Sequence, residues 1–363
     1  MSKKILAVAA AAGSLGLSLA AHADTQVTEN TSVGGRAFID FTSLDASTYA
    51  GGVGTKSAAS GYGIDVSRFY LILDHTFDST WSANLTTDFN YVSNDKATVG
   101  SGYTGETQVF IKKAYLQGKF SDALFVRAGS ADMAWIPYVE SNYGYRYVEK
   151  MALDRLSYGY TADWGLHAGG KFADGMFGYA LSTIEGRGYK NPTRSKSLDW
   201  EGRINATPVK GLALAAGFYS GKRGNDIDGT GAPAQLHTAS RVDLFAGYSI
   251  ESFKIGAEYF TVDYWNTITS ATAKDKADGF TVFASYQFTP TIAGFARYDD
   301  TTTNSNKNVV TSDGKDTYYN AGVAFKPRKG VDVAVAYKHE EKKLGSAKTA
   351  DSDEIGAWAQ VSF

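Results

Sequence analysis

The feature that most constrains this chain is an alternation of apolar and polar side chains that recurs along most of its length. In one segment, Trp81 and Leu85 fall on one face of an extended strand, while Asn84 and Asp88 fall on the other. The segment that ends at Phe363 repeats the pattern. A period of two is typical of β-strands with one apolar and one polar face. The alternation therefore predicts an all-β chain.

The alternating runs can be counted and measured. Most are about ten residues long, the length that a tilted β-strand needs to cross a lipid bilayer. Sixteen runs are expected, at 31–42, 63–77, 80–92, 105–120, 123–130, 162–172, 175–185, 196–207, 211–221, 238–250, 252–264, 278–289, 291–300, 316–326, 330–341 and 353–363. A membrane barrel needs an apolar side chain only at every second position, which agrees with the low mean hydropathy of −0.25.

The connections between these runs alternate between short and long. Short turns are expected at 78–79, 121–122, 173–174, 208–210, 251, 290 and 327–329. Longer polar connections are expected at 43–62, 93–104, 131–161, 186–195, 222–237, 265–277, 301–315 and 342–352. An even strand number with short turns at one end and long loops at the other is typical of bacterial outer-membrane barrels. We therefore predict a transmembrane antiparallel up-and-down β-barrel of sixteen strands, with both termini on the periplasmic side.

The first residues predict a segment that is not part of the barrel. A positively charged start precedes the apolar run 5–19, and Ala21-His22-Ala23 fits the small-x-small pattern of a cleavage site. The apolar run is too short to cross about 30 Å of hydrocarbon. We predict a cleaved signal peptide at 1–23 and a single barrel domain at 24–363.

Composition agrees with a closed sheet. The chain has 39 Gly, 23 Tyr and 20 Phe but no Cys. An exported chain without cysteine has no disulfides to stabilise it, whereas a closed sheet in lipid satisfies every backbone group. The net charge of −2 offers no basic excess for nucleic acid. No cofactor or metal site is expected, because the mature histidines are scattered without ligand spacing. They are His75, His167, His237 and His339.

The longest connection, 131–161, predicts a functional segment, because a structureless loop of this size is usually functional. In a wide barrel we expect it to fold into the lumen and to narrow the channel there. Its aromatic residues include Trp135, Tyr138, Tyr143, Tyr145 and Tyr147, and its acidic residues include Asp132, Glu140, Glu149 and Asp154.

Taken together, these features resemble the trimeric porins of Gram-negative bacteria. The resemblance rests on the signal peptide, the sixteen amphipathic runs, the long third external loop and a terminal Phe363 after Gln360-Val361-Ser362. It implies a homotrimer in outer-membrane lipid and lipopolysaccharide. It also implies a water-filled channel through which small hydrophilic solutes and ions diffuse passively.

A shorter stretch is similar to one branch of that family. The segments 110–120 and 124–129 resemble the strand pair before the third loop in the phosphate-selective O/P porins. As the resemblance implies, that branch collects anions on clustered lysines and arginines. The matching positions here are Lys113, Lys119 and Arg127. Anions such as phosphate are therefore an alternative solute class.

The phase of the alternation also predicts which side chains line the lumen. If the apolar phase faces lipid, the opposite phase faces the channel. Its basic residues are Arg36, Arg68, Lys113, Lys119, Arg127, Lys171, Arg203, Arg241, Lys254, Arg297 and Lys338, and its acidic residues are Asp40, Asp74, Asp88, Glu201, Asp243, Glu258, Asp332 and Glu354. Rings of acids favour cations and rings of bases favour anions. The alternative for any one residue is a cross-strand ion pair that contributes about 0.2–1 kcal/mol to sheet stability.

Three other functions remain open. The loop aromatics could form a track on which sugar rings stack; the alternative is that they pack the loop against the barrel wall or belong to an interfacial girdle. A surface adhesion protein would use its outer loops more than its lumen. A barrel hydrolase would need His167 beside a lumenal serine. Enzymatic motifs are otherwise lacking, and we expect no enzyme.

Overall fold

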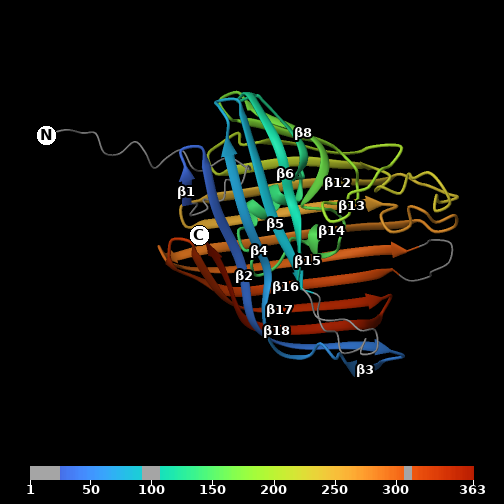
Figure 1. Cartoon of the computed structure of the whole chain (residues 1–363). Coiled ribbons are helices and arrows are strands. Elements are labelled where there is room, and N and C mark those ends of the chain that lie inside the picture. Colours follow the sequence, from blue (N-terminus) through green and yellow to red (C-terminus); the bar gives the residue numbers. More distant parts are fainter. Residues whose placement is uncertain (1–24, 92–106, 306–312) are drawn as a thin grey trace.

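The computed structural model describes residues 25–91, 107–305 and 313–363 (Figure 1). The predicted signal peptide at 1–23 and the predicted loop at 93–104 lie outside the described residues. The signal peptide and its cleavage therefore stay a prediction.

Sixteen antiparallel strands close into one barrel, which confirms the predicted architecture (Figure 1). They are β2 (Thr31–Ala50), β4 (Gly61–Thr76), β5 (Trp81–Tyr91), β6 (Thr107–Ser121), β7 (Leu124–Asp132), β8 (Ala162–Phe172), β9 (Phe177–Ile184), β10 (Asp199–Ala206), β11 (Leu212–Gly221), β12 (Ala239–Ile250), β13 (Phe253–Asp263), β14 (Asp275–Thr289), β15 (Ile292–Ser305), β16 (Gly314–Arg328), β17 (Val331–Leu344) and β18 (Ala347–Ser362). Each strand pairs with the next, and β18 closes the ring on β2, where Ala357 lies opposite Phe41. Two short strands, β1 (Thr25–Thr28) and β3 (Val53–Lys56), also pair with β2.

The two faces of the sheet have opposite chemistry. On β12, the apolar side chains of Val242 and Leu244 are 51% and 50% exposed, whereas Arg241 and Asp243, which alternate with them, are buried. An apolar exposed face and a polar buried face are the reverse of a soluble β-sandwich and suit a barrel in lipid. We call the side that carries Arg241 and Asp243 the inner face.

Several strands run further at the long-loop end than the alternation predicts. β2 continues to Ala50, through part of the expected connection 43–62, and β14 begins at Asp275 instead of 278. Outside the hydrocarbon layer an outward side chain no longer has to be apolar, so the alternation fades while backbone pairing continues. The hydrophobic pattern therefore measures the membrane-facing part of a strand and not its full length.

The expected long connection at 342–352 is wrong. β17 ends at Leu344 and β18 begins at Ala347, which leaves a two-residue turn at Gly345 and Ser346. Gly345 adopts φ +59°, the left-handed conformation that tight hairpins favour. Lysines and acids on both sides of the turn made the stretch look like a polar loop, although they lie on paired strands.

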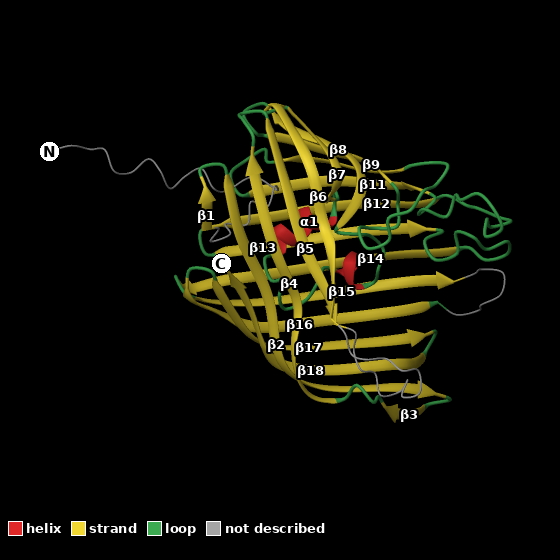
Figure 2. Cartoon of the chain, in the orientation of Figure 1, coloured by secondary structure: helices red, strands yellow, loops and turns green. Residues whose placement is uncertain are grey.

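Residues 133–161 connect β7 to β8 and contain two short helices, α1 (Ile136–Tyr143) and α2 (Ala152–Arg155) (Figure 2). Pro137 lies in the first turn of α1, where its missing N–H costs nothing, and Gly144 ends the helix at φ +85°. Among the described residues, no helix is long and apolar enough to cross a membrane.

This connection packs against side chains of the inner face from widely separated strands. One apolar cluster joins Trp135 and Leu153 to Phe260 of β13. A second joins Tyr147 to Phe38 of β2 and, at greater sequence distance, to strands β15–β18. Figure 2 shows the helices between the two sides of the barrel. That the segment narrows a channel stays a prediction.

Candidate functional site

The beginning of the 133–161 connection is held by buried polar groups of β10 and β13. The Trp135 indole Nε1–H donates to Glu258 Oε1 at 2.7 Å, and the Trp135 backbone N–H donates to Glu201 Oε1 at 2.9 Å. Arg203 donates from Nη1 to the Ala134 carbonyl at 2.6 Å. These bonds satisfy the backbone at the start of α1 and fix its direction.

Two further arginines of the inner face hold later parts of the connection. Arg241 donates to Asp243 and Glu201, both at 2.9 Å, and its remaining amine reaches the Tyr158 carbonyl at 2.7 Å. Arg297 is bound in the same manner: it pairs with Asp299 and donates to the Lys150 carbonyl at 2.6 Å. The predicted lining residues Arg203, Arg241 and Arg297 thus lie on the inner face, but they bind the loop instead of facing open solvent.

Arg155 of α2 holds the far end of the connection. Its guanidinium donates to Asp316 at 2.6 Å and to Asp299 at 3.4 Å, and it also pairs with Glu340. Nearby, Lys338 pairs with Glu149 of the loop at 3.2 Å. Sequence reasoning chose Glu149 but missed Arg155, because nothing in a non-periodic segment shows which of its charges meets the wall.

Of the other three acids predicted for the loop, Asp132 is the last residue of β7 instead, and Glu140 and Asp154 pair with a cation of the loop itself. Arg146 pairs with Glu140 at 2.5 Å and with Asp154 at 3.4 Å. Burial raises the pKa of the Glu140 carboxyl, although Arg146 opposes the shift. Arg146 also donates to the Tyr70 hydroxyl at 3.3 Å. The loop therefore contacts β4 through a guanidinium that is itself paired with both loop acids.

Basic side chains gather around the hydroxyl of Tyr70. Lys112 donates to this hydroxyl at 3.2 Å, as Arg146 does at 3.3 Å. Arg68 pairs with Asp88 at 3.2 Å within electrostatic range of Tyr70, and Arg36 is within range of both Tyr70 and Arg146. We call Arg36, Arg68, Lys112 and Arg146 the Tyr70 cluster.

Lys112, which the predicted lining does not include, also lies on the inner face. A β-bulge in the β5–β6 ladder pairs Thr86 with Lys113 and Thr87 with Ile111, which leaves Lys112 without an opposite residue. The extra residue shifts the phase of the strand, so both lysines turn inward: Lys112 is buried and Lys113 pairs with Asp132 at 3.0 Å. The signal was present in the sequence, because the outward apolar positions change from odd numbers (Ile111) to even numbers.

Two more of the predicted basic residues, Arg127 and Lys119, lie in different parts of the barrel. Arg127 lies on the inner face, where it donates to Gln117 at 2.7 Å and stacks on Tyr115. Lys119 lies away from the site, at the short-turn end, where it pairs with Asp122 at 2.9 Å and stays more than half exposed. Its position two residues before the end of β6 places it at the short-turn rim of the barrel.

Comparisons with known proteins support the fold. No known family's sequence profile matches the chain, and no curated protein matches it by sequence. Solved structures do match in shape. The outer-membrane channel DcaP of Acinetobacter baumannii superposes with a TM-score of 0.62 at 12% identity, covering 92% of this chain and 97% of that one. The anion-selective porin of Comamonas acidovorans gives 0.57 at 12% identity, covering 92% and 100%.

A third match is the outer-membrane protein OmpT of Vibrio cholerae in its trimer form, with a TM-score of 0.58 at 14% identity over 92% of this chain and 99% of that one. This chain has the fold of Gram-negative outer-membrane porins. At such identities the likeness extends to the fold alone, so the solute must be argued from the residues of the inner face.

The loop aromatics pack inward. The side chains of Trp135, Tyr138 and Tyr143 are at most 3% exposed. Tyr145 stacks on Phe295 with ring centres 4.2 Å apart, and burial raises the pKa of Tyr143 to about 12. Tyr147 is buried in the same manner. Rings without an accessible face offer little to a passing sugar, which weighs against the stacking track and favours the packing alternative.

His167 lies beside a serine, as the hydrolase hypothesis required. Its Nδ1 is 2.9 Å from Ser182 Oγ, but both residues are buried at 3% exposure or less, so a substrate has no access to the hydroxyl. Asp163 on the same strand accepts from the Trp164 and Gly186 backbone instead of orienting the imidazole. Among the described residues, no group of three or more His, Cys, Asp or Glu could hold a metal ion.

Proposed function

We propose that this protein is a porin: a water-filled channel for passive diffusion of small hydrophilic solutes and ions across the outer membrane. The observation that carries the proposal is the closed sixteen-stranded barrel whose exposed face is apolar and whose inner face is charged. A barrel of this strand number is too wide for its own side chains to fill. The 133–161 connection supplies part of the filling, and the rest is available to water.

The course of the channel follows from what the connection leaves uncovered. It contacts inner-face side chains of β10, β12, β13, β15 and β16, where the charges are buried. It also touches β4, where Arg146 donates to Tyr70. On β4, β6 and β7, Arg68, Lys113 and Asp132 keep 20%, 22% and 29% of their side chains exposed. We place the passage between the loop and this wall, with the loop as its narrowing element.

A preference for anions is the second candidate, and the Tyr70 cluster favours it. Lys112 and Arg146 donate to one hydroxyl, with Arg36 and Arg68 in electrostatic range of it. These four basic groups outnumber the three carboxylates paired with them, which are Asp88, Glu140 and Asp154. Rings of arginine and lysine favour anions. The similarly folded protein of Comamonas acidovorans is described as anion-selective, which agrees with the proposal but does not carry it.

Single-channel recording tests both statements. The purified protein, added to a planar bilayer under a KCl gradient, should give stepwise currents whose size rises with salt concentration, while detergent alone gives none. The reversal potential should take the sign expected for chloride permeation. A silent bilayer despite correctly folded protein contradicts the channel, and a reversal potential of the opposite sign contradicts only the anion preference.

Two further parts of the proposal concern export and assembly. We propose that residues 1–23 direct export and are removed, and that the barrel assembles as a homotrimer in lipid that contains lipopolysaccharide. The proposal rests on the signal-peptide pattern and on a fold shared with a protein that forms a trimer. N-terminal sequencing of protein from outer membranes and gel mobility before and after heating test the two parts separately.

A further inference from the structure

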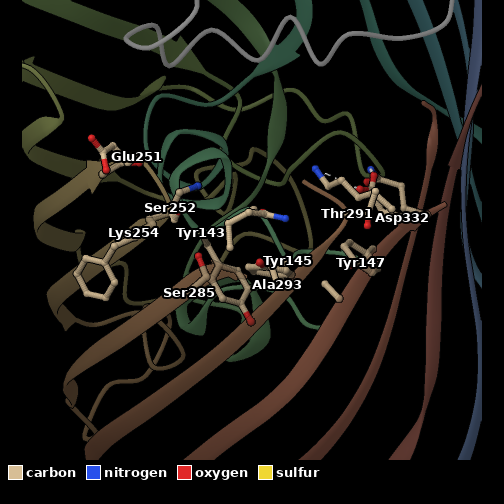
Figure 3. Close-up of a pocket in the computed structure, with 17 residues that line it drawn as sticks. Tyr143, Tyr145, Tyr147, Glu251, Ser252, Lys254, Ser285, Thr291, Ala293 and Asp332 are labelled. Atoms are coloured by element: carbon tan, nitrogen blue, oxygen red, sulfur yellow. Dashed lines mark hydrogen bonds and ion pairs between the residues drawn. The ribbon is translucent and has the colours of Figure 1, made fainter. Parts of the chain in front are cut away.

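A cavity of about 370 Å³ lies at the end of the barrel that carries the short turns (Figure 3). It is lined by Tyr143, Tyr145 and Tyr147 of the loop and by residues at the turns β12–β13, β14–β15 and β16–β17. No member of the Tyr70 cluster lines it. Its volume falls in the size range of small-molecule sites in proteins.

The cavity contains a cation that lacks a counter-charge. The ammonium group of the partly buried Lys254 has no hydrogen-bond or ion-pair partner within residues 25–91, 107–305 and 313–363. It points toward the loop, because a Cβ added at Gly144 would lie 3.6 Å from Nζ. A partly desolvated ammonium without a partner is costly, and an anionic ligand group would remove that cost.

The second lysine of the cavity is already neutralised. Lys326 pairs with Asp332 at 3.4 Å, and Gln360 donates to the same carboxylate at 3.1 Å. This arrangement leaves Lys254 as the cation available to a ligand, while the Asp332 carboxylate stays occupied. The other acid of the lining, Glu251, is an exposed residue of the β12–β13 turn, so water solvates its carboxylate. Figure 3 shows Lys254 and Asp332 on opposite sides of the loop tyrosines.

The rest of the lining is rich in groups that bind hydroxyls. Ser249, Ser252, Ser285 and Thr291 contribute hydroxyl groups and Gln287 contributes an amide. Each hydroxyl can both donate and accept, as the hydroxyls of a carbohydrate do. One free cation in a wall of hydroxyls and aromatic edges matches a ligand with one negative charge and several hydroxyl groups.

We propose that this cavity is a binding site for a small polyhydroxylated monoanion of the sugar-acid class. Its carboxylate pairs with Lys254, and its hydroxyls meet the serines and Gln287. The inference rests on the proposed channel function, since the cavity lies between the loop and the inner face at the short-turn end of the barrel. It adds to that function a binding site for one solute class at the short-turn end of the barrel.

The probe is gluconate, compared with glucose, which lacks the charge, and acetate, which lacks the hydroxyls. Each is added to the short-turn side of channels in a planar bilayer, and block of the potassium chloride current is measured as a function of concentration. Gluconate should block at concentrations at least about tenfold lower than either control, because a charge-assisted hydrogen bond and the hydroxyl contacts act together.

The variant Lys254→Gln should weaken gluconate block about tenfold and leave glucose block unchanged. Lys210→Gln, an exposed lysine on a different short turn, is the matched control and should behave as the parent protein. Gel mobility before and after heating shows that each variant forms the barrel. Two results would overturn the site and leave the channel intact. One is that gluconate and acetate block the parent channel equally well. The other is that gluconate blocks the Lys254→Gln variant as well as it blocks the parent. A folded parent protein that carries no current overturns the channel itself.

Discussion

The inner face of this barrel has two sides that share one sequence pattern and differ in what covers them. On β10–β16, the 133–161 connection excludes water, and Arg241, Asp243 and Arg297 are at most 2% exposed. On β4–β7, Arg68 and Lys113 stay about one-fifth exposed. The same alternation therefore produces a polar core on one side and a solvated wall on the other.

The difference shows why charge on an inward phase is not enough to identify a channel lining. Buried charges persist only with partners, and on the covered side Arg241 and Arg297 each have a carboxylate and a loop carbonyl to bind. On the open side, water supplies part of the solvation and the pairs are looser. The two sides should accordingly respond differently to the loss of one cation.

The largest effect is expected from Arg241→Ala on the covered side. The substitution leaves Glu201 and Asp243 buried without their cation, which should lower the free energy of unfolding by about 3–5 kcal/mol. Lys113→Ala on the open side removes a partly exposed pair and should cost less than about 1 kcal/mol. Denaturant unfolding in detergent micelles measures both. Equal losses would show that the two sides do not differ in burial.

A smaller effect is expected from Arg155→Gln, which releases the far end of the connection. Asp316, Asp299 and Glu340 lose their shared cation, so the unfolding free energy should fall by about 2–3 kcal/mol. Because the loop end is then free to move beside the passage, the open-channel current should become noisier. Lys196→Gln, in an exposed pair with Asp228, serves as the control for current noise. A quiet current in Arg155→Gln would contradict the loop as the narrowing element.

Two lysines of β6 lie in different surroundings: Lys112 is buried in the Tyr70 cluster, and Lys119 is exposed at the short-turn end. Lys112→Gln removes a charge from the Tyr70 cluster and should reduce the chloride-over-potassium permeability ratio about two- to fivefold, the effect of one charge at close range in water. Lys119→Gln, at the exposed rim, should leave the ratio unchanged. Reversal potentials in a KCl gradient measure both. A larger effect of Lys119→Gln than of Lys112→Gln would instead favour the basic residues that the family resemblance implied.

The fold could be predicted because lipid requires apolar side chains on one face of each strand, while water on the other face permits polar ones, and the sequence alternates accordingly. Sixteen strands and their order follow from it, and the error at 342–352 arose where strands leave the lipid and both faces may be polar. Lys112 was missed because a single bulge inverts the phase of every residue beyond it.

The site was less predictable for a different reason. The phase placed Arg203, Arg241 and Arg297 correctly on the inner face, but their role depends on where the 133–161 connection lies. That position is set by contacts distant in sequence, such as Arg155 with Asp316, which no local pattern reports. The loop acids Glu140 and Asp154 both pair with Arg146 of the same loop, a contact that no local pattern indicates.

The smallest expected effect is the pH dependence of stability at Glu149, which pairs with Lys338 of β17 beside the covered side. Burial alone would raise the pKa of Glu149, but the charges of Lys338, Arg297 and Lys150 outweigh burial and leave that pKa below its ordinary value. A carboxyl with a lowered folded-state pKa adds stability above its unfolded pKa and loses it as the pH falls through the folded value. Because the Lys338 pair is partly exposed, the contribution should be below about 1 kcal/mol.

Glu149→Gln should therefore unfold more easily than the parent protein at neutral pH, and the difference should vanish in acid, once the parent carboxyl is protonated too. Denaturant unfolding across this pH range measures the difference directly. Glu341→Gln, which removes an outer-end carboxyl that pairs with Lys343 and does not contact the loop, separates the effect at Glu149 from general acid sensitivity. A difference that persists unchanged in acid would mean that Glu149 supports the loop by its shape alone. The ion pair with Lys338 would then not hold the loop to β17, and the covered side of the barrel would end at β16.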